Sequence, residues 1–427
     1  MRSISNSEII VLEVYMGVQK LEESISEIIK DFRQGKVEIE LNCEHVHKWV
    51  SQFDVDDQKI ILEETLQVFQ RWYFNKTKIE EFLDNVVQSV VQDENYESVH
   101  AIFKDTVFLD MQEKGKSQTD LVQMLQNLVK KKYNCDINVQ PQVSVDNKYY
   151  IYIDDGLFTG SRLIKDLTRC IEQASECTKI DIWYLISCES GQSYGEEKVK
   201  SKAKEKNINI KIHVMNEIHN NKTIKSVNGE SVWDPRQDCL WPNKNLNDVP
   251  IIKDYKTSLE RTLGKERTIP YFYRTNRLEY FPGIFSSIKN RDIVERAFLK
   301  KGIEIVQKCR TEKGMYPLGY NLYPSAGFGA FCATDLNVPN TCPLVLWWGN
   351  IIEKGDVLDN WYPLLPRHTN EKSMTIIDFS NEIAYSNAGQ ENAWKQVYTT
   401  CPACGKGICF ENDGGTGFCI NCSPDFS

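Results

Sequence analysis

The stretch "YYIYIDDGLFTGSRL" (149–163) decides the fold, because an apolar run ends in two adjacent aspartates and a helical pattern follows at once. The apolar run is typical of a buried strand. Asp154 and Asp155 come next, and a Thr-Gly-Ser triplet precedes the helical period at 162–174. Such a passage from strand to helix is either a sharp acidic turn with an ordinary cap or a cradle for a sugar phosphate.

The surrounding sequence places this stretch in an α/β sheet. Strand-like runs alternate with helical patterns of about a dozen residues, which is typical of βαβ units and a mainly parallel sheet. We expect strands at 106–111, 137–145, 149–154, 179–187 and 208–215, and helices at 121–132, 162–174 and 195–206. Ligands bind such sheets at the carboxyl ends of the strands. Both the acidic pair and the Gly115-Lys116-Ser117 loop fall at such ends.

A ribose 5-phosphate needs two kinds of partner, and this stretch offers both in order. Carboxylates accept charge-assisted hydrogen bonds from neighbouring ribose hydroxyls, which suits Asp154 and Asp155. A phosphate binds backbone N–H groups at a helix N-terminus, which suits Thr159, Gly160 and Ser161. The glycine also lets the backbone approach the phosphate closely.

The pattern strand, Asp-Asp, three residues, Thr-Gly, helix resembles the PRPP loop of type I phosphoribosyltransferases. The resemblance implies that the 112–118 loop faces the diphosphate, and that Mg²⁺ enters with the substrate and bridges its diphosphate and ribose hydroxyls. Arg162 stands where that family usually has a small hydroxyl residue, and Gly156 where it usually has an apolar one. The implied site consists of catalytic Asp154 and Asp155 and of substrate-binding Thr159, Gly160, Ser161, Arg162, Gly115, Lys116 and Ser117.

The resemblance extends over roughly residues 45–367. The segments "WVSQF" (49–53), "PLGY" (317–320) and "PLVLWW" (343–348), together with this core, resemble a phosphoribosyltransferase-like family of bacterial conflict systems. Its members include effectors beside anti-phage modules, retrons among them. This implies an antiviral effector that acts on PRPP or a nucleotide, beside a partner such as a reverse transcriptase with its non-coding RNA. The alternative is a catalytically inactive sensor of PRPP or nucleotide, or a scaffold that docks a partner protein or ribonucleoprotein.

The rest of the chain divides by its pattern. Apolar residues recur at three- and four-residue spacing between 9 and 32, which predicts a long amphipathic helix. Thr77 and Glu80 have the spacing of a capping box ahead of another helix. The expected domains are a helical domain (1–104), a phosphoribosyltransferase-like core with a polar, irregular hood insertion (105–290), an extension of that core (291–370), a linker (371–398) and a zinc ribbon (399–427).

Five of the fourteen cysteines crowd the last 27 residues, in "CPACGKGICFENDGGTGFCINC" (401–422). Two Cys-x-x-Cys pairs separated by fourteen residues offer four thiolates for tetrahedral zinc, from Cys401, Cys404, Cys419 and Cys422. The ribbon holds Lys406 as its only cation, so we expect a structural or protein-docking module rather than a DNA-binding one.

Two weaker candidates favour structural interpretations. "CEHVH" (43–47) begins a helical segment and lacks a fourth metal ligand, so we expect surface or capping residues there. Trp347 and Trp348 could stack on bases, but their apolar surroundings favour a strand in the core.

Composition limits the class of protein. The net charge of −9 disfavours nucleic acid and anionic membranes as partners of the whole chain. The N-terminus carries charge from its second residue and has no signal-type apolar core, and no stretch approaches the roughly 20 apolar residues of a membrane span. We expect a cytoplasmic protein whose scattered cysteines stay reduced.

Overall fold

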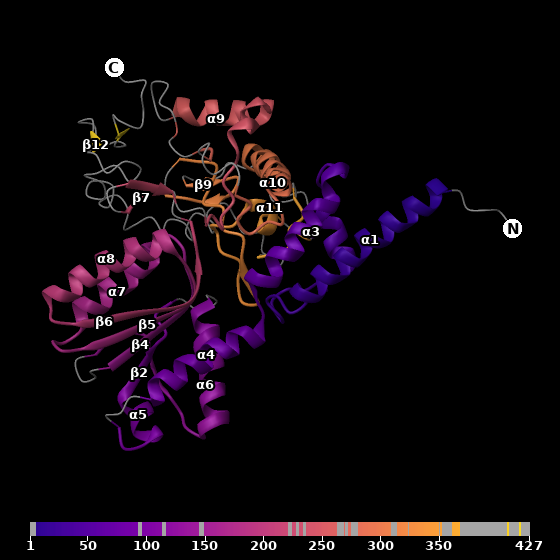
Figure 1. Cartoon of the computed structure of the whole chain (residues 1–427). Coiled ribbons are helices and arrows are strands. Elements are labelled where there is room, and N and C mark those ends of the chain that lie inside the picture. The colour runs from indigo at the N-terminus through magenta and orange to yellow at the C-terminus, as the bar shows by residue number, and fades with distance from the viewer. Residues whose placement is uncertain are drawn as a thin grey trace. The chain divides into compact units, whose positions relative to one another are not determined.

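Five parallel strands form the sheet that contains the acidic stretch, in the order β3-β2-β4-β5-β6 (Figure 1). They are β2 (Thr106–Leu109), β3 (Asn138–Gln140), β4 (Tyr149–Leu157), β5 (Lys179–Cys188) and β6 (Asn209–Ile218). Because every pair is parallel, all carboxyl ends lie at one edge of the sheet. The parallel α/β sheet that the sequence predicts is therefore confirmed.

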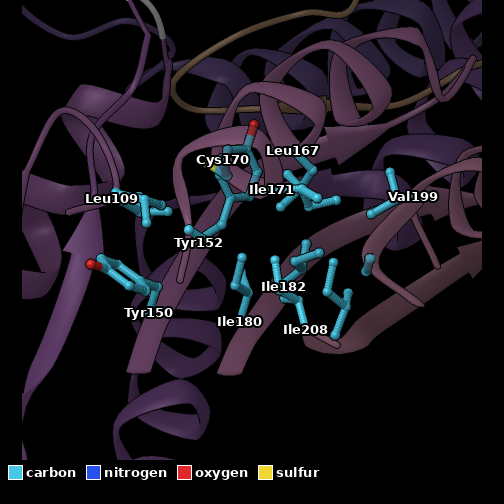
Figure 2. Close-up of a cluster of buried hydrophobic side chains, with 14 of the residues drawn as sticks. Leu109, Tyr150, Tyr152, Leu167, Cys170, Ile171, Ile180, Ile182, Val199 and Ile208 are labelled. Carbon is cyan, nitrogen blue, oxygen red and sulfur yellow. The ribbon is translucent and has the colours of Figure 1, made fainter. Parts of the chain in front are cut away.

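Helices α7 (Ser161–Gln173) and α8 (Glu189–Glu205) cover one face of this sheet. Leucine and isoleucine side chains of α7 recur at four-residue spacing and pack on the strands, because this spacing places them on one side of the helix. Figure 2 shows the resulting core, which includes Tyr150, Tyr152, Ile180, Ile182, Leu167, Ile171 and Val199. This packing fixes where α7 begins relative to the end of β4.

The computed structural model divides the chain into two units. The helical unit comprises residues 1–104, 112–137 and 238–373, and the sheet unit comprises residues 105–111, 138–237 and 374–427. The structure describes residues 6–92, 96–112, 117–144, 149–220, 224–227, 230–233, 236–262, 269, 272–274, 281–308, 314–322, 324–349, 351, 361–367, 408–409 and 418–419. No helix in these described ranges is both long and apolar enough to cross a membrane.

The helical unit joins segments that are far apart in the sequence. Strand β1 (Tyr73–Phe74) pairs in parallel with β11 (Ala333–Thr334), and the Trp49 indole N–H donates to the Val345 carbonyl at 2.8 Å. Residues 1–104, expected as a separate domain, thus share one unit with 291–367. The remaining elements of this unit are α1 (Asn6–Ile29), α2 (Cys43–Val50), α3 (Val55–Trp72), α4 (Lys76–Val91), α5 (Val99–Asp105), α6 (Ser117–Tyr133), η1 (Lys244–Asp248), α9 (Pro250–Thr262), α10 (Ile288–Lys308), β9 (Met315–Tyr316), β10 (Gly319–Tyr320) and α11 (Leu344–Trp347).

Several local predictions were wrong. Asn75, not Thr77, caps α4, and its side chain accepts from the Lys78 N–H at 3.1 Å. The region expected as an irregular hood contains the hairpin of β7 (Ile224–Val227) and β8 (Glu230–Trp233), as well as α9. Trp347 and Trp348 are buried as expected, but Trp347 ends a short helix rather than belonging to a strand.

His45 is a buried residue of α2, not the surface or capping residue that we expected. It is 2% exposed, and its two ring nitrogens lie 2.8 Å from the Tyr362 hydroxyl and 2.8 Å from the Leu364 carbonyl oxygen. Burial lowers the pKa of this imidazole from 6.5 to about 4. His45 is therefore neutral at pH 7 and fastens the 361–367 segment to α2.

This burial predicts an acid-sensitive contact. Between pH 6.5 and 4 the unfolded chain binds a proton at His45, whereas the folded chain does not. The free energy of unfolding therefore decreases as the pH is lowered through this range. We expect the opening free energy of α2 to fall between pH 7 and 4.5 by about 2.5 kcal/mol more in the wild type than in His45→Gln. Hydrogen exchange, corrected for intrinsic rates, measures this difference.

The matched control is His100→Gln, because His100 is an exposed histidine of the same unit. It should follow the wild-type pH dependence. Equal pH dependence in the wild type and His45→Gln would contradict the assignment.

Candidate functional site

Strand β4 carries both aspartates inside the strand rather than beyond its end. Its pairing with β5 continues to Leu157, which lies opposite Ser187, whereas the sequence pattern predicts a strand that ends at 154. Successive strand residues point to opposite faces of a sheet. Asp154 therefore shares the α7 face with Tyr152, and Asp155 points to the other face.

Asp154 lies under α7 in a buried row of side chains that are within hydrogen-bond distance of one another. The Tyr152 hydroxyl is 3.2 Å from Asp154 Oδ2 and 3.1 Å from Asp166 Oδ2 of α7. The Asp155 backbone N–H donates to Asp154 Oδ1 at 3.0 Å. Asp154 is 4% exposed and Asp166 is 7% exposed, whereas Asp155 is only half-buried. The two adjacent carboxyls therefore have different environments.

Burial raises the pKa of the Asp154 carboxyl well above its ordinary value, and the charge of Asp155 raises it further, while Arg162 acts in the opposite direction. Burial also raises the pKa of the Asp166 carboxyl. The Tyr184 hydroxyl of β5 lies in the same buried region, and burial raises its pKa well above the ordinary value too. These shifts favour the uncharged form of Asp154, on which Asp155 acts as a negative charge.

Glycines bring the turn after β4 into direct contact with α8. Gly160 caps α7 in the left-handed region, at φ +78°. A Cβ on Gly160 would lie 2.6 Å from the Gly191 carbonyl oxygen, and a Cβ on Gly191 would lie 1.8 Å from the Phe158 carbonyl oxygen. The sequence analysis did not single out Gly191 or Gly195. Their four-residue spacing, which places both glycines on one side of a helix, was the available signal.

The first turn of α7 has the features of an anion site. Gly160 is the N-cap residue of α7, and it has no side chain that could accept hydrogen bonds from the first backbone N–H groups of the helix. The Thr159 hydroxyl donates to Ser161 Oγ at 3.4 Å, which places two hydroxyls beside this turn. Arg162 is exposed, and its positive charge acts on Asp154. A helix N-terminus without a side-chain cap, with a cation nearby, suits a phosphate.

Other polar groups meet at the same edge of the sheet, where β5 and β6 end. The Asn220 side chain accepts from the Ser190 N–H at 3.0 Å and so caps the start of α8. His219 Nδ1 lies 3.8 Å from Glu189 and 3.7 Å from Glu217. These residues were not predicted, because their proximity depends on the pairing of β5 with β6.

The remaining predicted site residues stay predictions. Gly115 and Lys116 lie outside the described residues, and Ser117 begins α6 in the helical unit. Cys401, Cys404 and Cys422 also lie outside the described residues. Within the part of the chain that is described, no group of three or more His, Cys, Asp or Glu could hold a metal ion.

The backbone between the two Cys-x-x-Cys pairs forms a small antiparallel ladder. Strand β12 (Ile408–Cys409) pairs with β13 (Phe418–Cys419), and Ile408 lies opposite Cys419. This pairing folds the chain back between the pairs. Ile408 and Cys409, which follow the first Cys-x-x-Cys pair, therefore lie alongside Phe418 and Cys419, where the second pair begins.

Comparison with known proteins gives one family. The family model described as PRTase-CE matches residues 46–367. Among solved structures, the AQ2163 protein from Aquifex aeolicus matches with 15% identity over 39% of this chain and 85% of its own, at a TM-score of 0.23. That score is too low to support an argument about the fold. No curated protein matches the chain.

The glycine contact predicts that Gly191→Ala disrupts the turn. The new Cβ would overlap the Phe158 carbonyl oxygen, a backbone atom that cannot rotate away. We expect a loss of about 3 kcal/mol of stability in the sheet unit. Hydrogen exchange of the peptides that cover 149–173 measures the loss.

Gly17→Ala is the matched control, because a Cβ at this position of α1 meets nothing within 4 Å. Alanine there should leave the sheet unit unchanged. Unaltered exchange of 149–173 in Gly191→Ala would show that the close contact is absent.

Proposed function

The chain belongs to the PRTase-CE family, a phosphoribosyltransferase-like family, and from that premise we propose that it binds PRPP or a nucleotide through the β4–α7 turn. We propose further that it acts as a phosphoribosyltransferase-like effector of a bacterial antiviral defence system. The observation that carries the binding proposal is the turn itself. An ionised carboxylate and an uncapped helix N-terminus lie within six residues of each other at the carboxyl end of a parallel strand.

In the proposed complex each group has a separate task. Asp155 accepts hydrogen bonds from the ribose hydroxyls. The N–H groups at the start of α7, with the hydroxyls of Thr159 and Ser161, bind the 5-phosphate. Arg162 is near enough to the turn to add its charge. Gly160 lets the turn pack against α8, where a Cβ would overlap the Gly191 carbonyl oxygen.

The proposed reaction breaks the bond between C1 of the ribose and its leaving group. The leaving group departs with the electron pair, and a base or water forms the new bond to C1. Mg²⁺, when bound with the substrate, neutralises the diphosphate. The positive charge that develops on the ribose is stabilised by electrostatics, which the ionised Asp155 supplies on this chain.

The defence role is a proposal about context. It is supported by the resemblance to conflict-system effectors, and it brings with it a partner such as a reverse transcriptase with its non-coding RNA. Neither the defence role nor the partner follows from the geometry of the turn. The proposed site does not depend on them, because the turn would bind the same ligand in another context.

A sensor that keeps the turn only for recognition is the second candidate. The burial of Asp154 favours it, because one ionised carboxylate rather than two is then presented to the ribose. The exposure of Arg162 favours the enzyme, because an exposed guanidinium can contact a bound phosphate. The two candidates differ in turnover, not in binding.

We also propose a structural zinc ion held by Cys401, Cys404, Cys419 and Cys422. Four thiolates are a donor set that suits tetrahedral zinc. The β12–β13 ladder supports the proposal, because zinc ribbons place their two Cys-x-x-Cys pairs on such turns. A segment this short has little core, so the metal would supply most of its folding energy.

The binding proposal predicts that Asp155→Asn loses activity. Removing one charge-assisted hydrogen-bond acceptor should lower turnover of the accepted substrate about 30- to 100-fold. The full chain is incubated with Mg²⁺ and a panel of PRPP, NAD and nucleoside phosphates, and the loss of each compound is followed by mass spectrometry. Glu205→Gln, which changes an exposed carboxylate of the same unit, should match the wild type.

The outcomes separate the candidates. Turnover that falls by this factor in Asp155→Asn establishes the enzyme, and saturable binding without turnover establishes the sensor. Neither binding nor turnover by the wild type would contradict the proposed site.

The zinc proposal predicts one zinc per chain by elemental analysis. Cys401→Ser should lose it, because three thiolates bind zinc far more weakly than four. Cys409→Ser is the matched control, since Cys409 lies outside both Cys-x-x-Cys pairs. A chain purified without zinc, or equal loss in both variants, would overturn the proposal.

A further inference from the structure

A single tyrosine hydroxyl lies between two buried carboxyls under the proposed sugar-phosphate turn. Tyr152 is fully buried, and its oxygen is within hydrogen-bond distance of Asp154 on its own strand and of Asp166 on α7. The contact with Asp166 joins β4 to α7. The same three side chains therefore link the strand before the 158–160 turn to the helix after it.

The protons shared by the Asp154, Tyr152 and Asp166 side chains can be counted. A tyrosine hydroxyl carries one proton, and an ionised carboxylate can only accept. For each of the two contacts to have its own proton, one of the carboxyls must be protonated. If both carboxyls were ionised, two like charges would face one donor in a buried site, which is strongly unfavourable.

The surrounding charges place that second proton on Asp154. The groups that face Asp154 are Asp155 on β4, Arg162 and Asp166 on α7, and the buried Tyr184 on β5. Asp166 faces the cations Arg162, Lys165 and Arg169. Asp154 thus has two carboxyl neighbours and one cation, whereas Asp166 has three cations. Because Asp154 Oδ1 accepts the Asp155 N–H, Oδ2 is the atom left to donate to Tyr152.

Resting on the function proposed above, we propose that Asp154 is a positioning residue rather than a ligand of the ribose. It stays protonated and, through Tyr152 and Asp166, ties β4 to α7, so that Asp155 alone meets the ribose hydroxyls. Loss of the proton replaces the hydrogen bond by repulsion between Asp154 and Asp166. The turn between them then loosens, and the ligand binds less tightly.

The sign of the pH dependence follows. The carboxyl of Asp154 has a raised pKa in the folded chain, so its proton is present at low pH and is lost as pH rises. Affinity for the ligand should therefore fall as pH rises above that pKa. Asp154→Asn cannot lose a proton, and its amide can donate to Tyr152 and accept from the Asp155 N–H. Its affinity should not show this fall.

The experiment measures the affinity of the full chain for PRPP with Mg²⁺ by calorimetry between pH 6 and 10. We expect Asp154→Asn to bind within about threefold of the wild type at pH 7, with a flat pH profile. Asp154→Ala and Tyr152→Phe should each lose about tenfold, as expected for the loss of a buried hydrogen bond. Asp155→Asn should lose 30-fold or more at every pH. A loss in Asp154→Asn as large as in Asp155→Asn would overturn the positioning role.

Two further readouts do not depend on the ligand. Infrared spectroscopy should show a protonated carboxyl band at pH 7 that is absent in Asp154→Asn, and a band that persists in this variant would overturn the assignment. Hydrogen exchange across 155–163 should be faster in Asp154→Ala and Tyr152→Phe than in Asp154→Asn. If the wild type binds neither PRPP nor any nucleotide, the proposed function fails, while the band and the exchange rates still decide the role of Asp154.

Discussion

The parallel pairing of β4 between β2 and β5 is the constraint on which the site depends. Side chains alternate between the faces of a strand, so a shift of one residue in register would exchange the environments of Asp154 and Asp155. Both faces of β4 are buried, so that shift would misplace every side chain that the strand packs on either face. The difference between the two carboxyls is therefore a property of the whole sheet.

The turn after β4 depends on this register and on α8. Once Leu157 is paired with β5, the next three residues must reverse direction within a short distance to begin α7. They do so against the backbone of α8, where Gly191 leaves room for the Phe158 carbonyl. Asn220 in turn holds the start of α8 from the end of β6. Strands β4, β5 and β6 thus all contribute to the shape of one turn.

Local patterns predicted the parts of this structure that local physics decides. The strands of the sheet and helices α6 and α7 follow from hydrophobic period, and the acidic turn was predicted from its residue types. Long-range contacts were missed. The burial of His45 depends on Tyr362 and Leu364, which no local pattern links to it. The different roles of Asp154 and Asp155 depend on Asp166 and on the face of the sheet, whereas the sequence presents the two as equivalent neighbours.

The fastening of residues 361–367 to α2 has a consequence for how the gene can be divided. His45 contacts Tyr362 and Leu364, and the Arg33 guanidinium donates to the Arg367 carbonyl, so the last turn of this segment closes a unit that begins near the N-terminus. A reading frame shortened before Trp361 would remove these partners from the buried His45 ring and from the partly buried Arg33 guanidinium. Recombination that exchanges C-terminal modules among relatives should therefore preserve everything up to Arg367 and place its seams only beyond it.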